Sequence, residues 1–84
     1  MAAVTYFVAM PFDRGDDGEL VAGEAQERQS AGAAESAARR MAETSAGAVA
    51  FSRTGDPSTG EFEDAVVLRE YGEVPSLHKL LEAT

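Results

Sequence analysis

Along residues 4–12, large apolar side chains occupy every second position. This set consists of Val4, Tyr6, Val8, Met10 and Phe12. A period of two with aromatic and β-branched residues is typical of a strand, and we expect this set to form its one well-buried face. Pro11 has no N–H to donate to a neighbouring strand, so we expect the strand to lie at an edge there or to end.

A turn and a second extended segment are expected to follow. Residues 13–18 contain three aspartates and two glycines, a composition typical of a tight connection. We favour a second strand over residues 20–29 that starts at Leu20 and pairs with the first strand as a hairpin. The alternative is a helix that begins near Glu24.

Residues 30–46 predict the main helix. Its apolar stripe follows helical spacing and consists of Ala34, Ala37, Ala38, Met41 and Ser45. Ser30 is the expected N-cap, and Gly47 is the expected residue at which the helix ends. Because the stripe is mostly alanine, the helix can lie close to a sheet, with Met41 as its main anchor.

Two more strands and a short helix are predicted in the second half of the chain. Residues 48–53 and 62–71 have the apolar pattern of strands, and residues 54–60 between them have the composition of a loop. Pro75 can open a short C-terminal helix, which carries Leu77, Leu80 and Leu81 on one side.

This order of elements predicts a single α+β domain over residues 1–84. Strands in pairs on either side of a helix favour an antiparallel sheet of about four strands with one main helix packed on one face, β-β-α-β-β plus a short C-terminal helix. A chain of 84 residues is long enough for one domain with a modest core.

The charge of the chain restricts its partners. Asp and Glu number 15 against seven Lys and Arg, which gives a formal net charge of −8. Binding to nucleic acid or to an anionic membrane needs clustered basic side chains, so we expect neither, whereas a basic protein or a divalent cation stays compatible. There is no cysteine, which fits a cytoplasmic protein without disulfides. No apolar run approaches the length of a membrane span or has the features of a signal peptide.

The first turn partly matches a calcium-binding loop. An EF-hand loop reads D-x-[DN]-x-[DN]-G-x5-E, and Asp13, Asp17, Gly18 and Glu24 match this pattern. Gly15 brings no oxygen ligand at the third position, and a predicted strand, not a helix, precedes the loop. We therefore expect a charged hairpin turn, with a weak divalent-cation site made by Asp13, Asp17 and Glu24 as the alternative.

No arrangement typical of catalysis is recognisable. Carboxylates gather near the second loop, at Asp56, Glu61, Glu63 and Asp64. Neighbouring carboxylates can act as acid and base, but no nucleophile or oxyanion donor accompanies these at a fixed spacing. We expect a solvated loop, no enzyme and no cofactor; a small enzyme that uses residues 56–64 is the alternative. His78 is the only histidine, and we expect it on the surface.

The remaining features suggest binding. Leu77, Leu80 and Leu81 either fold back onto the sheet or contact a partner as an apolar hook. The first and the fourth predicted strands are candidate unprotected edges, and pairing of two such edges gives a two-fold dimer. We therefore expect a non-catalytic module that binds a protein partner or another copy of itself.

Three segments resemble a group of short bacterial proteins of unknown function. They are residues 6–13, residues 48–56 and residues 66–72, the last with Val66-Val67-Leu68 and Tyr71-Gly72. A weaker resemblance is to HicB-type antitoxins, which share a first strand, an acidic glycine turn like Asp16-Asp17-Gly18, further strands and a helix. Those antitoxins have a proline-glycine segment before the helix, where this chain has residues 24–30. Neither resemblance implies site residues.

Overall fold

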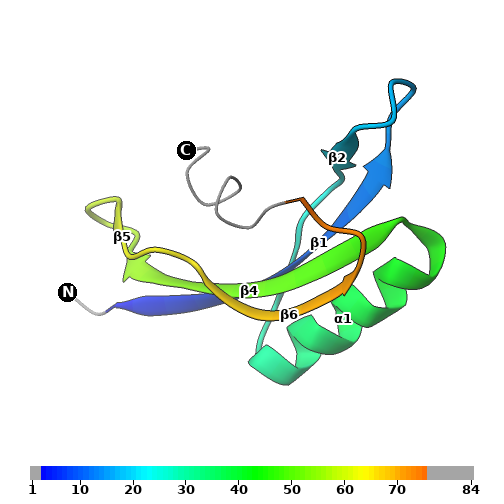
Figure 1. Ribbon diagram of the computed structural model, residues 1–84. Coiled ribbons are helices and arrows are strands. Elements are labelled where there is room, and N and C mark those ends of the chain that lie inside the picture. The colour runs from blue at the N-terminus through cyan, green and yellow to red at the C-terminus, as the bar shows by residue number, and fades with distance from the viewer. Residues whose placement is uncertain (1–2, 76–84) are drawn as a thin grey trace.

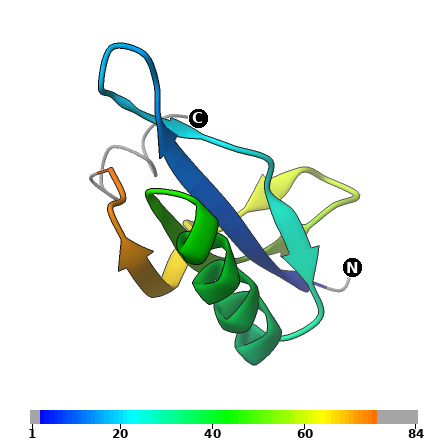
Figure 2. The same cartoon turned by 90° about the vertical axis from the view of Figure 1, so that its right-hand side faces the viewer.

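The computed structural model of the protein describes residues 3–75 and has two layers (Figure 1). One layer is an antiparallel sheet, and a helix lies across one face of it (Figure 2). The elements in chain order are β1 (Val4–Arg14), β2 (Leu20–Ala22), β3 (Gln26–Arg28), α1 (Ala31–Thr44), β4 (Gly47–Asp56), β5 (Glu61–Phe62) and β6 (Val66–Gly72). The predicted α+β class, the antiparallel sheet and the helix on one face are confirmed.

Strands β1 and β4 form the centre of the sheet. They pair from Val4 opposite Gly55 to Phe12 opposite Gly47. β2 and β3 pair with the other side of β1, and β5 and β6 pair with the other side of β4. Since β1 has neighbours on both sides, the prediction that the first strand is a free edge is wrong. Within residues 3–75, the fourth predicted strand does lie at an edge.

Pro11 splits the predicted second strand into β2 and β3. These two strands pair with β1 on either side of Pro11, and there two residues of β1 face three residues, 23–25. The partner chain bulges because Pro11 offers no N–H, although its carbonyl accepts a hydrogen bond from Gly23 N at 2.8 Å. β1 therefore continues through Pro11 to Arg14, and the alternative of a helix from Glu24 is wrong.

The predicted fourth strand is also interrupted. Between β5 and β6, two residues of β4 face the three residues 63–65, and Glu63 N donates to Thr54 O at 2.8 Å. Glu63 and Asp64 are both exposed and acidic, and such residues are depleted in strands. The expected count of about four strands is therefore corrected to six within the described residues.

Helix α1 begins as predicted and ends earlier. The Ser30 Oγ accepts a hydrogen bond from Ala33 N at 3.1 Å, which confirms Ser30 as the N-cap. The C-cap is Ser45, in extended conformation. Gly47 is the first residue of β4, so the prediction that it ends the helix is wrong.

Removal of the cap should weaken the fold. We expect Ser30→Ala to lower the free energy of unfolding by about 1 kcal/mol, because the N–H of Ala33 loses its acceptor. Urea denaturation followed by circular dichroism measures the change. Gln29→Ala is the control, since Gln29 is exposed and precedes the cap. Equal losses in the two variants would contradict the assigned role of the Ser30 side chain.

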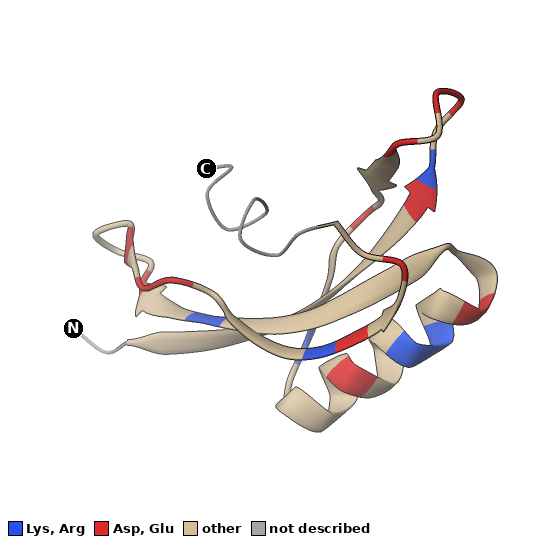
Figure 3. Cartoon of the chain, viewed as in Figure 1, with Lys and Arg blue, Asp and Glu red and all other residues tan. Residues whose placement is uncertain are grey.

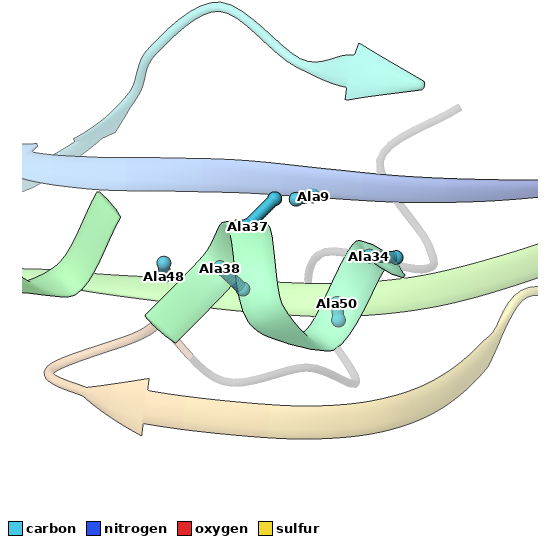
Figure 4. Close-up of a cluster of buried hydrophobic side chains, with 6 residues drawn as sticks. All are labelled: Ala9, Ala34, Ala37, Ala38, Ala48 and Ala50. Atoms are coloured by element: carbon cyan, nitrogen blue, oxygen red, sulfur yellow. The ribbon is translucent and has the colours of Figure 1, made fainter. Parts of the chain in front are cut away.

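The core between helix and sheet is built from alanine. Ala34, Ala37 and Ala38 of α1 meet alanines of β1 and β4, and all six of these residues are buried (Figure 4): Ala9, Ala34, Ala37, Ala38, Ala48 and Ala50. Larger side chains surround this alanine cluster and are partly buried: Phe7, Met41, Leu68 and Tyr71. The predicted stripe is confirmed for Ala34, Ala37, Ala38 and Met41, whereas Ser45 is the C-cap and lies outside this cluster.

The alanine cluster also decides which face of β1 the helix covers. Successive side chains of a strand point to opposite faces, and α1 packs on the face of Phe7 and Ala9. The predicted buried set lies on the other face, and only Phe12 of that set is buried, while Val4 is 39% exposed. The prediction is therefore met only in part: α1 covers the other face, because alanine lets the helix approach closely and the larger side chains do not.

The predicted C-terminal helix lies outside the described residues, as do Leu77, His78, Leu80 and Leu81. Within residues 3–75, no helix has the length and apolar character needed to cross a membrane.

Candidate functional site

The sheet surface opposite α1 carries large apolar side chains and is here named the helix-free face, because no helix of residues 3–75 covers it. Alternation from the alanine cluster places these residues on it: Val4, Tyr6, Val8, Met10, Phe12, Val49, Phe51, Arg53 and Val67. Six of them are half-buried: Tyr6, Val8, Met10, Phe51, Arg53 and Val67. Phe12 and Val49 are buried. Two loops rise from this side of the sheet at its opposite ends (Figure 1).

One end of the helix-free face is covered by the chain after β6. A Cβ atom added to Gly47 would lie 2.5 Å from Glu73 N, so the backbone of Glu73 lies directly on Gly47. Gly72 turns the chain over with φ +68°, and Glu73 N donates to Ala46 O at 2.9 Å. Phe12, which is opposite Gly47, is buried at this end.

An ion pair joins this end to the first hairpin. The guanidinium of Arg14 lies 2.8 Å from the Glu73 carboxylate and also donates to Gly18 O. Both side chains of the ion pair are more than half exposed, so the pair contributes little to stability. Its effect is to connect residues 14–18 with the turn after β6.

The opposite end is covered by Phe62. A Cβ atom on Gly55 would lie 2.5 Å from Cγ of the Phe62 ring, so the ring can lie there only because residue 55 is glycine. The ring centroids of Phe62 and Tyr6 are 6.0 Å apart, and the Arg53 guanidinium lies 5.4 Å from the Phe62 centroid. A depression of about 310 Å³ opens beside this cluster, lined by Ala3, Gly55, Asp56, Glu61, Phe62 and Glu63.

Asp56 holds the loop of residues 57–60 in place. Its carboxylate accepts hydrogen bonds from Ser58 Oγ at 2.6 Å and from Ser58 N at 2.9 Å. These bonds favour the charged form, with the hydroxyl bond the larger cause, and they hold the pKa of Asp56 below its ordinary value of 3.8.

We expect a carboxyl titration by NMR to give a pKa for Asp56 below 3.8, and Ser58→Ala to raise this pKa because the hydroxyl donor is lost. The folded-state pKa is depressed, so the stabilisation by Asp56 is present above its unfolded pKa and is lost as the pH falls through the folded value. Ser36→Ala, on the exposed side of α1, should leave the pKa of Asp56 unchanged. An equal pKa in wild type and Ser58→Ala would contradict the assigned cause.

Acidic side chains gather in the two raised loops (Figure 3). The first loop carries Asp16, Asp17 and Glu19, and the second region carries Asp56, Glu61, Glu63 and Asp64. The two arginines of the helix-free face are both engaged: Arg14 with Glu73, and Arg53 with Phe62 and the carbonyl of Glu63. The apolar floor therefore lies between two acidic ends.

The three predicted calcium ligands lie in different structural settings. Asp13 is on β1 opposite Val21, Asp17 accepts a hydrogen bond from Glu19 N at 3.1 Å, and Glu24 lies in the bulge between β2 and β3. Among residues 3–75, no group of three or more His, Asp or Glu side chains is arranged to hold a metal ion. Calcium binding through Asp13, Asp17 and Glu24 stays a prediction.

Asp56, Glu61 and Glu63 line an open depression, and Asp56 is engaged with Ser58. Catalysis by this loop also stays a prediction. The sequence patterns did not predict the close contacts of Gly47 with Glu73 and of Gly55 with Phe62. A glycine inside a strand is nevertheless a known sign of close backbone approach.

Comparison with protein-family models, with curated proteins and with solved structures finds no significant match to this chain.

Proposed function

We propose that this protein is a non-catalytic interaction module that binds a protein partner through the helix-free face of its sheet. One observation carries this proposal: a floor of half-buried apolar side chains, including Val8, Phe51 and Val67, lies between two raised ends. Contiguous apolar surface rimmed by polar residues is typical of protein interaction sites.

The dimensions of the floor indicate the size of the interface. Gly47 and Gly55 lie under the two covered ends and are eight positions apart on β4, which limits the length of the floor to about 27 Å, and three strands side by side are about 14 Å wide. The projected area is therefore at most roughly 400 Å², no more than about half of what each partner buries in a standard interface. A short segment of a partner fits this area better than a whole globular domain.

Two adjacent valines of β6 offer a matched test. Val67 is opposite Phe51 on the helix-free face, whereas Val66 is opposite Ser52 on the α1 side and is 59% exposed. We expect the wild-type protein and Val66→Asp to capture the same partner from extract of the source cells, and Val67→Asp to lose it. Purified partner then gives the dissociation constants, and circular dichroism checks that both variants are folded.

Retention of the partner by Val67→Asp would overturn the proposal. So would a wild-type protein that captures no partner and is monomeric by light scattering. A dimer that Val67→Asp dissociates and Val66→Asp leaves intact would assign the helix-free face to self-association instead.

A further inference from the structure

We infer that the segment bound by the helix-free face is a basic amphipathic helix, with an apolar stripe and Lys or Arg on both sides of it. This inference rests on the proposed function and adds the chemistry of the partner. It follows from three features of the described residues: the carboxylates that flank the floor, the unequal distribution of the arginines and the width of the floor.

Carboxylates flank the apolar floor on both long sides. Glu27 of β3 is opposite Val8 of β1, and Glu70 of β6 is opposite Val49 of β4. Residues paired across antiparallel strands have their side chains on the same face, so Glu27 and Glu70 border the helix-free face on its two sides. Both glutamates are exposed. A ligand lying along β1 and β4 therefore has a carboxylate of β3 on one side and a carboxylate of β6 on the other.

The arginines are mostly on the other side of the sheet. Arg39 and Arg40 are exposed on α1, and Arg69 lies 3.8 Å from Glu35 of α1. Arg28 is opposite Phe7, which is on the α1 side. Since Arg14 and Arg53 on the helix-free face are already engaged, the carboxylates that border this face keep their attraction for a cationic ligand.

The width of the floor selects a helix. A helix with its side chains is about 10–12 Å in diameter, which fits a floor of about 14 Å, and the limit of about 27 Å between the two covered ends allows at most about 18 helical residues in contact with the floor. Apolar residues at a spacing of three and four would contact the floor, and basic residues next to this stripe would reach Glu27 on one side and Glu70 on the other.

Synthetic peptides of 18 residues test the inference with the full chain. The first has a leucine stripe at helical spacing flanked by lysines, the second has glutamate in place of each lysine, and the third is a scrambled form of the first. We expect the lysine peptide to bind and to shift the amide resonances of Val8, Phe51 and Val67. Its affinity should fall at least about tenfold between 50 and 500 mM salt, because exposed charges are screened.

A matched pair of charge reversals locates the attraction. Glu70→Lys should lower the affinity for the lysine peptide by roughly fivefold at low salt, whereas Glu43→Lys, on the exposed side of α1, should change it less than about twofold. Equal effects of the two variants would overturn the inference, because the attraction would then come from the net charge alone.

Other results would overturn the inference in distinguishable ways. Equal binding of the lysine and glutamate peptides would remove the charge requirement while the helix-free face stays an interaction site. If Val67→Asp keeps the natural partner and the lysine peptide shifts no residue of the helix-free face, the inference and the proposed function both fail. If the full-length variant with Leu77, Leu80 and Leu81 each changed to Ser binds the peptide and the wild type does not, residues 76–84 occupy the face instead.

Discussion

Replacing Gly47 with alanine should lower the free energy of unfolding by about 1–3 kcal/mol, which is the range for side chains forced into filled space. The new methyl group would lie 2.5 Å from the backbone nitrogen of Glu73 and closer still to its carbonyl oxygen. Backbone atoms cannot rotate away as a flexible side chain can. Movement of Glu73 would break its hydrogen bond to Ala46 O and disturb the turn that Gly72 makes with a positive φ.

Thermal unfolding followed by circular dichroism measures this effect, with a fall of roughly 4–8 °C in Tm for each kcal/mol in a domain of this size. Gly32→Ala is the control. Gly32 lies in α1, and a Cβ atom there has no heavy atom within 4 Å. The control should raise the free energy of unfolding by about 0.5–1 kcal/mol, because alanine favours the helix over glycine. A Gly47→Ala protein as stable as wild type would contradict the crossing of Glu73 over Gly47.

The second large effect is expected at the alanine cluster. Ala38→Leu should lower the free energy of unfolding by about 1–3 kcal/mol, because it adds three carbon atoms at a fully buried position. Ala38 faces a sheet surface that is itself built from buried alanines. The helix can accept leucine there only if it moves away from β4, which would separate the other small side chains of the cluster.

Ser36→Leu provides the matched control for this substitution. Ser36 is exposed on the same helix, and a surface substitution of this kind changes stability by no more than about 0.5 kcal/mol. Urea denaturation of the two variants side by side measures the difference. If Ala38→Leu and Ser36→Leu are equally stable, the helix and the sheet are not in the close contact that the alanine cluster implies.

The helix is the element that could be predicted best. Ser30 has the hydroxyl that caps a helix, and the alanine stripe repeats with the helical period. Both signals depend on residues within four positions of each other, so they can be recognised from the local sequence without knowledge of the rest of the fold. The strand over residues 4–12 was predictable for the same reason, because its period of two is also a local pattern.

The candidate site was predictable only in part. The apolar set that includes Val8 was identified as one face, but it was assigned to the covered side of the sheet. Both faces of β1 carry apolar residues, and alternation cannot say which face a helix will cover. The choice depends on Ala48 and Ala50, which are some forty residues further along the chain and let α1 approach.

Gly47 illustrates the difference between features of this fold that arise from near neighbours and features that arise from packing. The local pattern determined the position of the helix, its cap and its alanine stripe, and the charge determined an acidic surface. A glycine after a helix is typical of a helix end, yet Gly47 serves as the crossing point for Glu73. The bulge opposite Pro11 and the choice of the sheet face that α1 covers were likewise decided by contacts between distant segments. The period and the capping residues encode local conformation through near neighbours, whereas strand register, covered faces and backbone crossings exist only once the chain has packed.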